Sequence, residues 1–228
     1  MREEITMAED VSASDERDER DGGYTLVELI VAMSIMTGLL AVVFTILITV
    51  TQQTADNLGR VRQTEQLRIG LMQIDRQVRS GNVISDPLAE TVGDSGVEPG
   101  YSLRVYTQAD GVFECAQWRV IFTDGVDQGE LQYRSWDPAW ASTGLVEGWQ
   151  AVARGIVDQR ASNPSAARPF ERTASAGSSA AQSVRVSLWV KDSQALDRSN
   201  ASTISSVLTG RNTVFGYPSD RCANVPSP

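Results

Sequence analysis

Hydrophobic residues gather in one long run near the start of the chain. Twenty-two consecutive residues without a charge, Leu29 to Val50, follow the acidic residue Glu28. At 1.5 Å per residue this run would measure about 33 Å as a helix, which matches the roughly 30 Å hydrocarbon layer of a membrane. The run is too long for a cleavable secretory signal and lacks a small-residue cleavage site behind it. The pattern therefore predicts a retained transmembrane helix over residues 24–51.

A second helical pattern follows the apolar run without an intervening proline. Its apolar residues recur at helical spacing, and polar residues fill the other faces. These apolar positions are Leu58, Val61, Leu67, Leu71, Ile74 and Val78. We expect the helix to continue as an amphipathic segment over residues 52–81. Ser80-Gly81-Asn82 indicates its end, with Gly81 as a left-handed C-terminal cap.

Beyond Pro87 the apolar positions alternate with a period of two, as in strands with one buried face. This pattern predicts strands within residues 101–107, 116–122, 129–137, 148–158 and 184–190. The Ser/Ala-rich segment 159–183 contains two prolines and predicts a surface loop. Residues 202–212 fit a short strand or a loop. The expected fold class is α+β, with a long N-terminal helix packed on an antiparallel sheet and a β-rich globular domain over residues 82–228.

Composition and charge exclude several functions. The net charge is −9, and residues 1–23 hold nine acidic residues and three arginines, which accounts for −6 and leaves −3 for the remainder. Residues 1–22 also lack aromatic side chains, which predicts a disordered leader. No cluster of basic residues is present, so we expect no nucleic-acid partner. The chain has no histidine and two cysteines, so we expect no metal site and no cofactor.

The two cysteines, Cys115 and Cys222, leave two possibilities open. They could form a disulfide in an oxidising compartment, or remain two buried thiols, because pairing depends on geometry. A disulfide closing a loop of about a hundred residues would contribute up to roughly 4.7 kcal/mol on chain-entropy grounds.

The start of the chain resembles the class III signal of type IV prepilins and type II secretion pseudopilins. The matching residues are Gly23, then Tyr24-Thr25-Leu26-Val27-Glu28-Leu29, and the uninterrupted apolar run. The resemblance implies that a prepilin peptidase cuts between Gly23 and Tyr24 on the cytoplasmic side and N-methylates Tyr24. Residues 1–23 would then be a cleaved leader, and the apolar run would remain as membrane anchor and assembly helix.

Glu28 has two interpretations at this stage. In the family that the signal resembles, this glutamate neutralises the N-terminal amine of a neighbouring subunit, so Glu28 would pair with the amine of another Tyr24 during assembly. In low dielectric such a pairing favours one axial register. The simpler interpretation is that any helix accepts an acid in its first turn because of the macrodipole.

Further resemblances indicate the kind of subunit. Major pilins often carry a proline in the apolar run, and none occurs here between Tyr24 and Asp86. Residues 67–84, 129–137, 155–158, 184–190 and 209–212 are similar to segments of the larger minor pilins and J-type minor pseudopilins, which cap or prime the filament.

We therefore expect a structural subunit without enzymatic activity. Its expected partners are the prepilin peptidase, other pilin or pseudopilin subunits and membrane lipid. The expected location is the cytoplasmic (inner) membrane, crossed once, with the N-terminus in the cytoplasm and the C-terminal domain outside it, and the filament after assembly. The alternative is a single-span, membrane-anchored binding module that keeps residues 1–23 and does not assemble.

Overall fold

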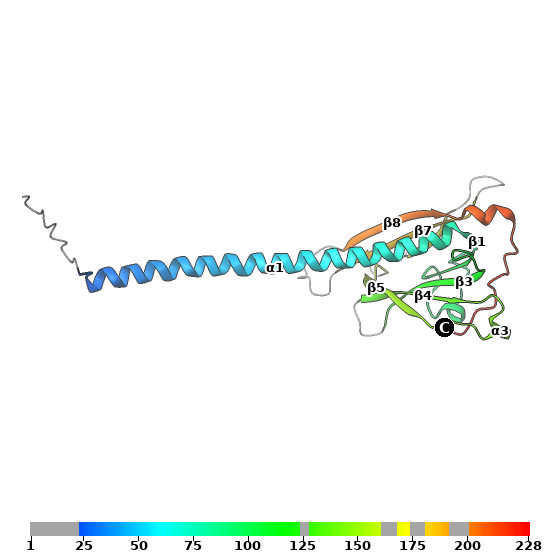
Figure 1. The fold of residues 1–228 in the computed structure, drawn as a ribbon, viewed down its shortest axis with the longest axis horizontal. Helices are drawn as coiled ribbons and strands as arrows, with labels where there is room; N and C mark the ends of the chain where they lie inside the picture. The colour runs from blue at the N-terminus through cyan, green and yellow to red at the C-terminus, as the bar shows by residue number, and fades with distance from the viewer. Residues whose placement is uncertain (1–22, 124–127, 161–167, 174–180, 192–200) are drawn as a thin grey trace, which may run out of the picture. The chain divides into compact units, whose positions relative to one another are not determined.

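The computed structural model describes residues 23–123, 128–160, 168–173, 181–191 and 201–228 (Figure 1). The chain divides into two compact units, one ending at Val50 and one running from Thr51 to Pro228. The predicted leader, residues 1–22, lies outside the described residues.

One helix, α1 (Leu26–Arg79), contains 54 residues and contributes to both units. The predicted transmembrane and amphipathic segments therefore form a single uninterrupted helix. It begins two residues later than Tyr24, because Thr25 caps its first turn.

The second unit is built on an eight-stranded antiparallel sheet in the order β1-β2-β3-β4-β5-β7-β6, with β8 paired to β7. Its strands are β1 (Gly81–Ile84), β2 (Ser102–Thr107), β3 (Glu114–Ile121), β4 (Gln128–Trp136), β5 (Gln150–Val157), β6 (Phe170–Thr173), β7 (Ser183–Val190) and β8 (Ser202–Thr209). Two short α-helices, α2 (Val92–Ser95) and α3 (Trp140–Thr143), and a 3-10 helix, η1 (Arg211–Phe215), complete it. All five predicted strands are confirmed. So is the α+β class with its long helix on an antiparallel sheet, an arrangement that is pilin-like.

The second half of α1 covers one face of this sheet. Leu67, Ile74 and Val78 are fully buried in a core that also contains Trp118 of β3. Burial of each such aliphatic side chain stabilises the fold by about 1.5–3 kcal/mol. Within this interface Trp118 Nε1 donates a hydrogen bond to Gln77 Oε1 at 2.6 Å. The predicted helical stripe therefore supplies both the apolar contact and a specific polar link to the sheet.

The predicted cap at Gly81 is wrong. Gly81 does not adopt a positive φ and is the first residue of β1, so the chain passes from helix to strand without a left-handed residue. A Cβ at Gly81 would lie 2.9 Å from both Val105 Cγ1 and Val78 O. Glycine is needed here because the strand passes very close to α1 and β2.

The predicted surface loop over residues 159–183 contains a strand, β6, that the sequence interpretation missed. Phe170 at its start is fully buried, and β6 pairs with β7 over four residues. The remaining residues of that segment that are not described are 161–167 and 174–180. A four-residue strand with two charged members is too short for its alternation to stand out.

The sheet is also buried on both faces near its centre, whereas the sequence pattern predicts one buried face. All residues from Cys115 to Val120 in β3 are buried. Since side chains alternate between faces, α1 covers Trp118, and a second layer must cover Gln117 and Arg119. This second face is described below.

Candidate functional site

The residues that the sequence assigns to cleavage lie just before α1. Leu29 N–H donates to Thr25 O at 3.1 Å, and Glu28 N–H donates to Thr25 Oγ1 at 3.2 Å. Thr25 and Glu28 have the spacing of a capping box, a signal that the sequence interpretation did not use. Gly23 and Tyr24 therefore lie outside the helix, and Tyr24 is 85% exposed. A peptide bond in such an exposed, non-helical segment is accessible to a peptidase.

Glu28 occupies the first turn of α1, where the macrodipole favours an acid. It is exposed, and within the described part of the chain no ion pair involves its carboxylate. The described part of the chain therefore leaves the Glu28 carboxylate open to a cationic partner.

The first unit presents apolar side chains on every side of the helix. Its large hydrophobic residues within the described part of the chain are all exposed, from 43% for Leu40 to 85% for Tyr24. A helix that is apolar all round and has no protein cover is typical of a segment in lipid.

The hydroxyl groups of this unit are also compatible with lipid. Between Leu26 and Val50 the hydroxyl residues are Ser34, Thr37, Thr45 and Thr49, and each donates to the carbonyl four residues earlier at 2.7–2.9 Å. No hydroxyl donor in this span is left for water to satisfy. Glu28 is the single charged side chain that a membrane would have to accommodate.

Cys115 and Cys222 form a disulfide, which decides between the two possibilities left open by the sequence. Their Cα atoms are 5.8 Å apart and their sequence separation is 107 residues. The bond attaches the C-terminal residues to β3, on the face of the sheet away from α1. Disulfides persist outside reducing compartments. The apolar helix and the disulfide together indicate a membrane-anchored chain whose globular unit is extracytoplasmic.

The buried guanidinium of Arg134 holds the C-terminal residues that follow Cys222 in the chain. Its Nη1 donates to Ser227 O at 2.8 Å, and its Nη2 donates to Pro226 O at 3.0 Å and to Asp94 O at 3.0 Å. Its Nε and Nη2 also donate to Gln117 Oε1 at 3.0 and 2.8 Å. Burial lowers the pKa of Arg134 to about 10, so the group is still cationic at neutral pH.

Aromatic residues complete the layer that covers Gln117 and Arg119 on the face of the sheet away from α1. The Trp149 ring lies 4.3 Å from the Arg134 guanidinium and 3.8 Å from that of Arg119. Trp140 Nε1 donates to Asn224 O at 3.0 Å, which adds a further attachment for the C-terminal residues. The whole layer escaped prediction, because polar residues alternating along β3 and β4 have the pattern of a solvent face. Its geometry is that of a structural clamp, since the guanidinium donors end on this chain's own oxygens.

A buried ion pair lies beside the clamp. Glu90 is 2% exposed, and its Oε1 lies 2.9 Å from Arg104 Nη2. The pKa of Glu90 is raised, because burial disfavours the carboxylate more strongly than Arg104 favours it.

Glu90 should make stability depend on pH. A raised carboxyl pKa means that the folded chain holds its proton above pH 4.5, where the unfolded chain loses it. The unfolding free energy of the wild type minus that of Glu90→Gln should therefore be highest below pH 4.5 and fall as the pH rises through the raised pKa of Glu90. Urea unfolding of both proteins in detergent across this pH range measures the difference. A difference that grows with pH would contradict the assignment.

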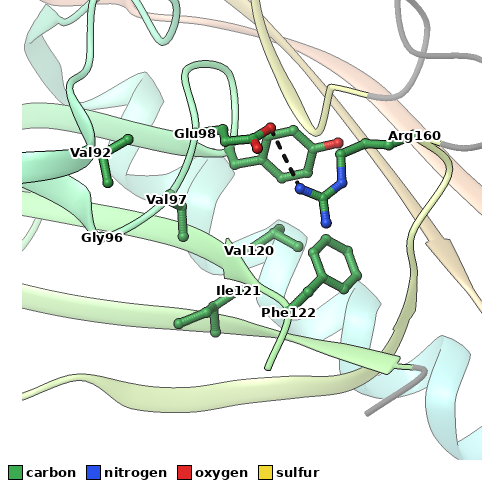
Figure 2. Close-up of a pocket in the computed structure, with 9 residues that line it drawn as sticks. Val92, Gly96, Val97, Glu98, Val120, Ile121, Phe122 and Arg160 are labelled. Atoms are coloured by element: carbon green, nitrogen blue, oxygen red, sulfur yellow. Dashed lines mark ion pairs between the residues drawn. The ribbon is translucent and has the colours of Figure 1, made fainter. Parts of the chain in front are cut away.

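A cavity of about 180 Å³ is lined by Val120 and Ile121 of β3 and by Val92 of α2, among others (Figure 2). Arg160 lies over the Phe122 ring at 5.2 Å and over the Tyr101 ring at 5.4 Å. It also forms ion pairs with Glu98 at 3.5 Å and with Asp158. Hydrogen bonding to Arg160 lowers the pKa of Asp158. The cavity is smaller than typical ligand sites of about 300–1,000 Å³, and its cation is already neutralised, so it gives no separate binding function.

The structure thus brings Gly23, Tyr24 and Glu28 together at the start of α1 and joins Cys115 to Cys222. Comparisons of the chain with protein-family models, with curated proteins and with solved structures gave no match.

Proposed function

We propose that this protein is a structural minor pilin or pseudopilin subunit, processed by a prepilin peptidase and assembled through α1 into a type IV pilus or type II secretion-like filament. In this proposal it acts in initiation or at the filament tip and has no enzymatic activity. Its partners are the peptidase, other pilin or pseudopilin subunits and membrane lipid.

One observation carries the proposal: the Gly23–Tyr24 bond and Glu28 lie at the start of an exposed, wholly apolar helix that continues into a pilin-like globular unit. An anchor alone requires the apolar run. It does not require a glycine, an aromatic residue and an acid in this register, and an acid in lipid is unfavourable by about 2.5–3.5 kcal/mol on insertion scales. The proposal gives each of these residues a purpose.

The mature N-terminus tests the proposal. Mass spectrometry of the protein from its host membranes should find a chain that begins at N-methyl-Tyr24 in place of Met1. In Gly23→Leu the chain should remain full length. A Cβ at Gly23 would meet no atom within 4 Å, so this substitution alters recognition and leaves the fold intact. Gly22→Leu is the matched control, because it alters the neighbouring glycine, and this variant should be processed.

Two results would count against the proposal. An unprocessed wild-type chain would favour the single-span binding module. A chain cut after the apolar run would make that run a removable signal and exclude assembly through α1.

A further inference from the structure

Strand β8 forms a long open edge of the sheet. It has eight residues, Ser202–Thr209, none of them charged and none a proline. Its ladder partner is β7, and within the described residues no strand pairs with its other side. An uncharged edge of this length is a template for another strand.

The hydrogen bonds around β7 show which peptide groups of that strand point toward β8. Ser187 N–H donates to Pro169 O at 2.8 Å and Lys191 N–H donates to Gly155 O at 3.1 Å, both on the side of β6 and β5. Odd-numbered residues of β7 therefore bond on that side. Even-numbered residues bond toward β8, because bonding directions alternate along an antiparallel strand.

The register with β7 then determines which peptide groups of β8 point to its open side. Even-numbered residues of β7 pair with even-numbered residues of β8, and Gly210 N–H, in the same phase, donates to Gln182 O at 2.9 Å. The odd-numbered residues of β8 therefore direct their N–H and C=O groups to the open side of the strand. These residues are Thr203, Ser205, Val207 and Thr209, and all four are exposed.

The other sheet edges are protected. At β1, Ile84 N–H donates to the Gln182 side chain at 2.8 Å, and Asn212 of η1 donates to Ser80 O at 3.4 Å. At β6 the edge is four residues long and includes the charged Glu171 and Arg172. Charges, short length and covering segments are the devices that prevent strand addition, and among the residues that the structure describes β8 has none of them.

The side chains of β8 define which strand would fit. Leu208 is buried and Ile204 is packed against the core, whereas Val207 on the opposite face is 52% exposed. An added strand would place every second side chain beside Ile204 and Leu208, where apolar residues are favoured, and the others beside Ser205 and Val207. The absence of charge on β8 favours an uncharged strand.

We propose that the open edge of β8 binds an extended, alternately apolar segment of another protein by strand addition. A second copy of β8 is a poor occupant. In Figure 1, β8 is drawn roughly parallel to the part of α1 that belongs to the second unit. Antiparallel pairing of two β8 strands would point these parts of the two helices in opposite directions, which does not suit two chains anchored through the same helix. The proposal concerns the globular unit and does not depend on processing at Gly23.

A peptide of residues 183–190 with threonine in place of Arg185, SVTVSLWV, is a suitable probe, because β7 is the strand that β8 already pairs with and the replacement makes the peptide side chains uncharged. Binding of the fluorescein-labelled peptide to the full chain in detergent micelles is measured by fluorescence anisotropy. Ser205→Pro removes one outward N–H without touching the β7 ladder, since proline is tolerated where an edge N–H faces solvent. We expect binding to be weakened about tenfold or more, which corresponds to about 1.4 kcal/mol for the lost ladder bond.

Ser205→Ala is the matched control, because it keeps the N–H, and its affinity should stay within about twofold of the wild type. Val207→Lys is a second test that leaves every backbone bond in place and adds an edge charge, so it should also weaken binding. Failure of the wild type to bind, or equal binding by Ser205→Pro and Ser205→Ala, would overturn the proposal. A wild-type chain that instead dimerises through β8 would also overturn it.

Discussion

Replacing Glu28 with glutamine is expected to leave the protein cleaved and membrane-anchored while removing it from the filament. The carboxylate has no cationic partner among the described residues, and cleavage would create a cationic amine on Tyr24, four residues earlier. Between neighbouring helices in low dielectric, the ion pair would favour one register over others. Glutamine has nearly the same shape but no charge. If the pairing contributes only about 1.4 kcal/mol, its loss would already lower incorporation of the variant tenfold.

The measurement is the fraction of the protein in sheared filaments compared with the membrane fraction. Glu65→Gln is the matched control, because Glu65 is an exposed acid of the same helix beyond the apolar run. This control should assemble normally. If Glu28 were present only for the macrodipole, its loss would cost about 0.3–1 kcal/mol of helix stability and would leave incorporation nearly unchanged. Normal incorporation of Glu28→Gln would therefore refute the assembly interpretation.

The long helix and the main strands were predictable because each repeats a strong local signal. The charge-free run from Leu29 to Val50 has the length of a membrane-spanning helix, and the stripe ending at Val78 follows helical spacing. The alternation around Trp118 likewise indicated a strand. β6 was missed because it has a single buried residue, Phe170, and therefore shows no alternation in the sequence. It is a strand because it pairs with β7, and that pairing depends on chain topology.

The second buried face illustrates a limit of periodicity. Gln117 and Arg119 occupy the polar positions of an alternating strand, which is the pattern of a solvated face. They are buried because the C-terminal residues return across the sheet, a contact that joins positions about a hundred residues apart. No local pattern encodes such a return. The Cys115–Cys222 pair was a candidate for it, but spacing alone could not distinguish a disulfide from two thiols.

Replacing Arg134 with methionine is expected to lower the free energy of unfolding by about 3 kcal/mol. Methionine fills similar space but donates no hydrogen bond, so the Gln117, Asp94, Pro226 and Ser227 oxygens lose their common donor. Each buried acceptor left unpaired costs about 1–3 kcal/mol. Two effects reduce the total. The desolvation of the guanidinium is relieved, and the C-terminal carbonyls can turn to water.

Arg154→Met is the matched control, because Arg154 lies on the adjacent strand and pairs with Glu130 at 2.9 Å with a side chain that is 76% exposed. Such exposed pairs contribute about 0–1 kcal/mol. Arg134→Lys should recover only part of the loss, since an ammonium cannot reach the oxygens that the planar guanidinium bridges. Urea unfolding of the full chain in detergent, followed by tryptophan fluorescence, measures all three. If Arg134→Met were no more destabilising than Arg154→Met, the disulfide and the Trp140 hydrogen bond would hold the C-terminal residues, and the guanidinium clamp would contribute nothing.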